Sequence, residues 1–227
     1  TKDGFTSAYL TGHAFKRALT QENSAVMEYS KVKGIENDKN NFKIYLENNE
    51  HLIAKKIVLA GGVWLEDMLS WLNVKIPIKC LINQLIITER MPQVMKTVLS
   101  IANGLLSLKQ FDNGTVLIGG GWQGLGDKER GGVEAIPENL KGNIRLACHV
   151  IPELRYGRMV RVWLGLEAET ADALPVIGNV PGISNAYVIG SVHSGYPSGP
   201  YMGWLLSQFI MGQEPDMPLF EPSRLIS

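Results

Sequence analysis

The last quarter of the chain most constrains how it can fold. Residues 161–178 alternate as a strand, an acidic turn and a second strand, and residues 185–191 have the pattern of a third strand. A glycine-rich loop follows, and we predict that it opens a helix at Pro200. Such a junction directs several backbone N–H groups at one point, which is typical of sites for anionic or carbonyl-bearing ligands. The pattern therefore predicts a site for a large, flat cofactor.

Composition narrows the classes of protein. The 227 residues carry 22 Lys+Arg and 22 Asp+Glu, so nothing suggests a nucleic-acid or membrane-surface partner. No apolar run reaches the roughly 18 residues that a transmembrane helix needs, and the start has no signal-peptide pattern. Cys80 and Cys148 lie far apart without CxxC spacing. We therefore expect reduced core thiols and a cytoplasmic location.

The periodicities predict a mixed α+β fold. A helical period covers residues 7–21, and two strands follow, joined by a turn at residues 37–41. Residues 57–60 are continuously apolar, as expected of a strand covered on both faces, and Gly61 and Gly62 end it.

The middle third has an antiparallel pattern. We predict strands at residues 76–88, 105–110 and 115–120, the last two closed into a hairpin by Asp112-Asn113-Gly114. Residues 140–151 form an amphipathic helix pattern. This predicts an antiparallel sheet domain inserted between the strands of another layer.

Several short motifs have ordinary interpretations. Residues 119–124 match GxGxxG, but a polar, glycine-broken stretch follows, so we interpret them as a loop. The four histidines lack metal-ligand spacing, and no metal site is expected. His193, beside the glycine-rich loop, is either a ligand contact or a structural residue. The acidic residues after the strand at 161 form a solvated turn, or Asp172 fixes that turn by bonding its own backbone.

The order of these motifs resembles a known family. Arg161-x-Trp163-x-Gly165 with Asp172-x-x-Pro175-x-Ile177-Gly178 is similar to the C-terminal signature of the FAD-dependent amine and amino-acid oxidases. That family includes D-amino-acid oxidase, glycine oxidase and the sarcosine oxidase β subunits. Residues 59–64, 77–85, 188–195 and 200–206 resemble further family segments in the same order.

The resemblance implies an organisation into three segments. Residues 1–75 would be a partial FAD-binding domain, residues 76–160 a substrate-binding antiparallel sheet with helices on one face, and residues 161–227 a return to the Rossmann-like FAD domain with the flavin-ring loop and C-terminal helix. Family members open with a GxGxxG unit that holds the FAD pyrophosphate. The chain resembles the part after that unit, so we expect it to be a C-terminal portion that binds FAD weakly or not at all alone.

The resemblance also implies site residues, although it identifies no catalytic residue. Cofactor contacts would come from Val32, Gly61, Gly62, His193, Ser194, Gly195 and Ser198, and the substrate would meet Trp163 and Glu167. Glu167 stands where many members have an Arg that pairs with the substrate carboxylate, and Val192 replaces a usual Gly.

The implied function is oxidation of the C–N bond of a small amine or amino acid, such as sarcosine, glycine, proline or an opine, by hydride transfer to FAD. The alternative is a non-catalytic binding or assembly subunit that keeps the fold without redox activity. Glu167 and Val192 favour that alternative. The sequence is compatible with homo- and hetero-oligomers.

Overall fold

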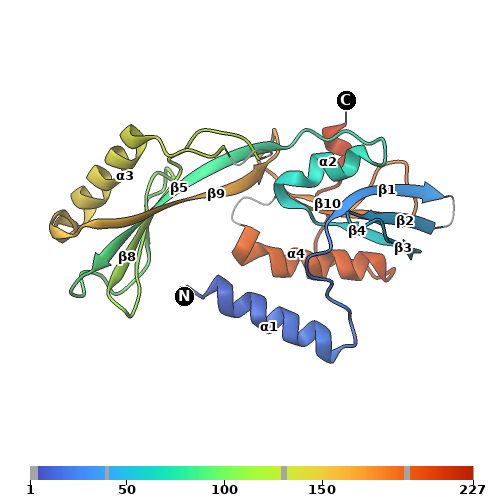
Figure 1. Cartoon of the computed structure of the whole chain (residues 1–227), viewed down its shortest axis with the longest axis horizontal. Coiled ribbons are helices and arrows are strands. Elements are labelled where there is room, and N and C mark those ends of the chain that lie inside the picture. Colours follow the sequence, from blue (N-terminus) through green and yellow to red (C-terminus); the bar gives the residue numbers. More distant parts are fainter. Residues whose placement is uncertain (1–4, 39–40, 129–131, 192–194, 227) are drawn as a thin grey trace. The chain divides into compact units, whose positions relative to one another are not determined.

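The computed structural model describes residues 5–38, 41–128, 132–191 and 195–226 (Figure 1). These residues form the mixed α+β fold that the sequence predicts. They divide into two compact units, Thr1–Thr6 with Cys80–Glu167 and Ser7–Lys79 with Ala168–Ser227. The predicted division at residues 75/76 and 160/161 stays a prediction.

The first unit is built on a sheet with strand order β6-β7-β8-β5-β9. Its strands are β5 (Lys79–Arg90), β6 (Leu99–Ser100), β7 (Ser107–Gln110), β8 (Thr115–Gly119) and β9 (Met159–Glu169). Every second side chain of β5 between Ile82 and Thr88 is buried, because α3 (Pro137–Val150) and η2 (Pro152–Tyr156) pack on that face (Figure 1). β7 and β8 form the hairpin predicted at Asp112-Asn113-Gly114.

The second unit contains a small mixed sheet with order β10-β11-β4. β10 (Val176–Asn179) pairs antiparallel with β11 (Ala186–Gly190), which pairs in parallel with β4 (Ile57–Leu59). α4 (Gly195–Ile210) packs Leu205 and Leu206 against this sheet. The short η1 (Gly62–Trp64) and α2 (Leu65–Ser70) follow β4.

The same unit carries an antiparallel meander and an exposed helix. The meander consists of β1 (Val32–Asp38), β2 (Asn41–Leu46) and β3 (His51–Ala54). Helix α1 (Ala8–Gln21) covers most of the range predicted for it, and the Ser7 hydroxyl caps it by accepting from the Leu10 N–H. The Thr11 hydroxyl lies 2.6 Å from the Tyr196 hydroxyl of α4.

Two expectations were wrong. Helix α4 begins at Gly195 rather than at Pro200, so Pro200 lies inside the helix. Proline cannot donate to a preceding carbonyl, which made it a reasonable but mistaken starting point. Strand β4 is not covered on both faces, because Val58 is 46% exposed between two buried neighbours. In the described part of the chain, β4 is an edge strand that pairs with β11.

Candidate functional site

Glycine residues lie at the carboxyl ends of β4 and β11. The parallel register pairs Ile57 with Ala186 and Leu59 with Val188, so both strands end at the same edge of the sheet. In open sheets this edge is where ligands bind. Gly61 and Gly62 follow β4, and Gly190 ends β11.

The conformation after β4 requires glycine. Gly62 has a φ of +57°, and a Cβ on Gly61 would lie 2.2 Å from the Met68 sulfur. A Cβ on Gly62 would meet no atom within 4 Å, so the space beside this backbone is open. The loop can therefore accept the close approach of a flat ligand.

Ser191 supplies an unusual polar group at the same edge. Its side chain is only 3% exposed, its φ is +50°, and its Oγ has no hydrogen-bond partner among the described residues. A buried hydroxyl without a partner among the described residues requires an explanation, and a bound ligand can supply the missing partner. This orphaned hydroxyl and the glycine loop fit the carbonyl-rich edge of a flavin. The sequence analysis did not single out Ser191, because only burial distinguishes it from other serines.

The predicted cofactor residues lie in several elements of the second unit. Gly195 and Ser198 are in the first turn of α4, which begins shortly after Ser191. Val32 starts β1 in the separate meander. His193 and Ser194 lie outside the described residues, as does Val192.

The predicted substrate residues share one face of β9 in the first unit. Trp163 and Glu167 are four positions apart, so both point away from the face that packs on α3. The Trp163 side chain is 44% exposed, and the Arg161 guanidinium carbon lies 6.0 Å from its ring centroid. Gly165 lies between them, and a Cβ there would meet nothing within 4 Å.

Glu167 belongs to a hydrogen-bond network that the sequence analysis missed. Asn83 Nδ2 of β5 donates to Glu167 Oε2 at 2.6 Å, and Gln123 Nε2 donates to Asn83 Oδ1. The Ile82 N–H in turn donates to Gln123 Oε1 at 2.7 Å. Two adjacent amides in the otherwise apolar residues 80–87, Asn83 and Gln84, were the weak signal available in the sequence.

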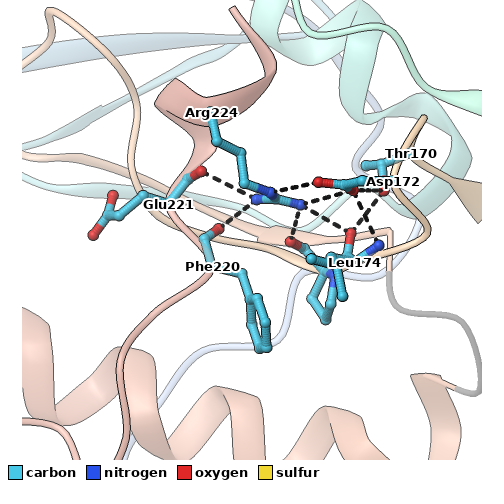
Figure 2. A network of polar contacts seen from close by, with 7 residues as sticks. Thr170, Asp172, Leu174, Phe220, Glu221 and Arg224 are labelled. Atoms are coloured by element: carbon cyan, nitrogen blue, oxygen red, sulfur yellow. Dashed lines mark hydrogen bonds and ion pairs between the residues drawn. The ribbon is translucent and has the colours of Figure 1, made fainter.

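Asp172 fixes the turn between β9 and β10 (Figure 2). This confirms the interpretation that its side chain bonds the backbone of its own turn. Its Oδ1 accepts from the Leu174 N–H at 3.1 Å and from the Thr170 hydroxyl at 2.9 Å. Arg224, in η3 (Pro222–Leu225), donates to both carboxylate oxygens, at 2.8 and 3.2 Å. The Arg224 hydrogen bond is the main cause that holds the pKa of Asp172 well below its usual range.

Arg224 also donates to backbone carbonyls of this turn and of the segment that precedes η3. Its Nη2 reaches the carbonyls of Leu174 at 3.1 Å and Pro175 at 2.7 Å, and its Nη1 reaches those of Phe220 at 2.8 Å and Glu221 at 3.1 Å. The guanidinium thus ties the turn to the segment that precedes η3 (Figure 2).

The GxGxxG string adopts the loop conformation expected of it. Gly119 ends β8, and no helix occurs in residues 120–128 or 132–136, so the GxGxxG string is a loop. Within the described ranges, no three His, Cys, Asp or Glu side chains gather as a metal site would require. None of the helices described is both long and apolar enough to cross a membrane.

The Asp172–Arg224 pair gives a testable pH dependence. Replacing Asp172 with Asn keeps an acceptor for the Leu174 N–H but removes the charge. Both partners are partly exposed, so we expect a loss of about 1 kcal/mol in the free energy of unfolding at pH 7, measured by urea denaturation. Because the folded pKa is lowered, this contribution is complete above the ordinary Asp pKa of about 3.9 and disappears as the pH falls through the lower folded value.

The wild type and the Asp172→Asn variant should therefore converge in stability in acid. Asp112→Asn, in the exposed β7–β8 turn, is the control and should change stability less. If the free energies of unfolding of the wild type and Asp172→Asn differed by the same amount at every pH down to 2, the carboxylate charge would not stabilise the turn.

The sequence is similar to the sequences of known proteins. The chain is 26% identical over 222 residues to hydrogen cyanide synthase subunit HcnC of Pseudomonas aeruginosa, covering 96% of the chain and 51% of that protein. It is 25% identical over 198 residues to glycine oxidase of Pseudomonas putida, covering 87% of the chain and 53% of that protein. It thus spans about half the length of these curated relatives.

The fold also matches a solved structure. L-proline dehydrogenase from P. horikoshii superposes with a TM-score of 0.85 and 21% identity, over 95% of this chain and 59% of that one. The sequence pattern of the family described as FAD dependent oxidoreductase matches residues 1–209. The chain therefore belongs to the DAO family of FAD-dependent oxidoreductases.

Proposed function

We propose that this chain functions in an FAD-dependent oxidoreductase that oxidises the C–N bond of a small amine or amino acid. The observation that carries the proposal is the edge formed by β4 and β11: open space beside Gly62 follows one strand, and a buried Ser191 hydroxyl with no partner among the described residues follows the other. Membership of the FAD-dependent family supports the identity of the cofactor.

We propose cofactor contacts from the second unit. Gly61 and Gly62 would let backbone approach the flavin, and the Ser191 hydroxyl would hydrogen-bond to it. Gly195 and Ser198, in the first turn of α4, would add the positive end of the helix dipole. His193, Ser194 and Val32 complete the proposed set. FAD, when bound, would supply the hydride acceptor, and the protein would supply positioning.

We propose substrate contacts from the first unit. Trp163 would form a wall and Glu167 a polar contact on the same face of β9. Glycine, sarcosine, proline or an opine are the proposed substrates. The names of glycine oxidase and L-proline dehydrogenase support an amino-acid substrate.

A subunit without redox activity is the second candidate. It is favoured by Glu167 and by the likeness to HcnC, which is named as a synthase subunit. Because HcnC is named as a subunit, we also propose that this chain functions in a hetero-oligomer. A cytoplasmic location is also proposed, supported by the free thiols of Cys80 and Cys148.

Flavin reduction tests the enzymatic proposal. The test uses the full product of the gene loaded with FAD, and glycine, sarcosine, L-proline or octopine is added without oxygen. The flavin absorption at about 450 nm should disappear, because hydride transfer reduces the flavin. The matched acids that lack the amine should leave the spectrum unchanged. A flavin that stays oxidised with all of these amines would favour the non-catalytic subunit.

Replacing Ser191 with Ala tests the cofactor edge. The change removes a buried hydroxyl that has no partner in the described part of the chain, so the flavin-free protein should gain about 1 kcal/mol in free energy of unfolding. The same change should weaken FAD binding roughly fivefold, because a hydrogen bond to the cofactor is lost. Calorimetric unfolding and fluorescence titration with FAD, both on the full product of the gene, measure the two effects.

Ser207→Ala is the control for this pair of effects. Ser207 donates to the Trp204 carbonyl at 2.7 Å within α4, so its loss should leave FAD affinity unchanged. Unchanged FAD affinity in Ser191→Ala as well would contradict the proposed contact.

The 227 residues alone should bind FAD weakly or not at all. Their GxGxxG string, at residues 119–124, leads into a loop and offers no helix N-terminus for a pyrophosphate. When the chain is mixed with FAD and passed through a gel-filtration column, the material that absorbs at about 450 nm should elute at the position of free FAD. A yellow protein peak would show that the chain holds the cofactor by itself.

A further inference from the structure

The first unit contains a pocket at the end of its sheet. The pocket is lined by the β7–β8 turn, by the segment that follows β5, and by Phe5 from the N-terminal segment. Its volume is about 340 Å³. Sites for small molecules have volumes of about 300–1,000 Å³. This pocket is therefore large enough for a small ligand, and three separate segments of the chain contribute to it.

Gln110 holds two of these segments together. Its Nε2 donates to the carbonyls of Pro92 at 2.9 Å and Gly114 at 3.1 Å, and its Oε1 accepts from the Met95 N–H at 3.3 Å. The Met91 N–H also donates to the Gly114 carbonyl at 2.9 Å. These bonds fix the walls of the pocket, so that a ligand would not lose affinity by ordering them.

One part of the pocket lining is apolar. The rings of Phe5 and Phe111 meet edge to face, with their centroids 5.9 Å apart. The thioether side chains of Met91 and Met95 line the same pocket. Phenyl rings and thioethers both pack favourably against an aromatic ring. This part of the lining therefore suits an apolar side chain, and an aromatic one best.

Two opposite charges, Lys96 and Asp112, line the same pocket. Within the described part of the chain, neither side chain forms an ion pair or a hydrogen bond, so they do not neutralise each other. A ligand that carries both an ammonium group and a carboxylate can satisfy both of them at once. A ligand with a single charge would match one of them and meet a like charge at the other.

We propose that this pocket binds a small zwitterion with an apolar side chain, such as an aromatic amino acid. Lys96 binds the carboxylate of the ligand and Asp112 binds its ammonium group, while the two rings and the two thioethers contact its side chain. The inference does not rest on the proposed function, and it assigns no reaction to the pocket.

The test uses an NMR signal that comes from the pocket itself. The full product of the gene, loaded with FAD and kept without oxygen, is labelled with ¹³C at its methionine methyl groups. The variants Met91→Leu and Met95→Leu assign the two signals that belong to the pocket. Titration of these two signals gives the dissociation constant for each probe at this site.

Four probes separate the contributions of charge and side chain. L-phenylalanine carries both charges and an aromatic ring. Hydrocinnamate lacks only its ammonium group, and phenethylamine lacks only its carboxylate. Glycine carries both charges but has no side chain.

L-phenylalanine should shift both methyl signals, and glycine should bind more weakly because it cannot reach the apolar lining. Hydrocinnamate and phenethylamine should each bind about threefold more weakly than L-phenylalanine, a modest factor because both charged side chains are exposed. Asp112→Asn should remove the advantage of L-phenylalanine over hydrocinnamate and keep its advantage over phenethylamine. Lys96→Gln should do the reverse.

Variants of α3 supply the matched controls. Lys141→Gln and Glu138→Gln remove the same two kinds of charge, but these residues pair with each other at 3.3 Å and do not line the pocket. Both variants should leave all four affinities unchanged. Phe5→Leu removes a ring without removing a charge, so it should weaken the three aromatic probes alike. Thermal unfolding followed by circular dichroism checks that each variant is folded.

Three results would overturn the inference. The first is that millimolar L-phenylalanine leaves both pocket methyl signals unshifted. The second is that the probes with a single charge bind as tightly as L-phenylalanine. The third is that Asp112→Asn and Lys96→Gln weaken all the probes equally, because the effect would then be structural. Flavin reduction tests the proposed function separately, so failure of one proposal is distinguishable from failure of the other.

Discussion

The parallel pairing of β11 with β4 is the contact on which the second unit depends. The two strands come from opposite ends of the chain, and their register places both carboxyl ends at one edge. One strand brings the Gly61-Gly62 loop to this edge and the other brings Ser191. Parallel strands need a long connection, and here the connection includes the whole sheet of the first unit. The proposed cofactor edge therefore forms only when segments far apart in the sequence have come together.

Local patterns were predictable because neighbouring residues determine them. The helix at α1, the hairpin turn at Asp112-Asn113-Gly114 and the succession of β9, turn and β10 all follow from periodicity and turn chemistry. The bond from Asp172 to its own turn was also a local inference. Its partner Arg224 was not foreseen, since nothing in the sequence between them indicates the contact.

Features that depend on distant contacts were not predictable. The exposure of Val58 follows from the position of β4 at an edge of the sheet, not from its own apolar run. The start of α4 at Gly195 contradicts the usual position of proline. The link from Gln123 through Asn83 to Glu167 joins three segments of the chain, and polar residues in strands are too common to reveal it. The resemblance named Glu167 as a site residue, but it did not identify Asn83 and Gln123 as members of its hydrogen-bond network.

The Arg224 contacts have a consequence for how the chain is made. The turn that ends β9 is held by a guanidinium from the last few residues. During synthesis, β9, β10 and α4 leave the ribosome before that guanidinium does. Until Arg224 is available, the backbone carbonyls of Leu174 and Pro175 must accept hydrogen bonds from water instead. The turn is therefore completed only after the segment that carries Arg224 has been synthesised, and that segment is a structural part of the fold.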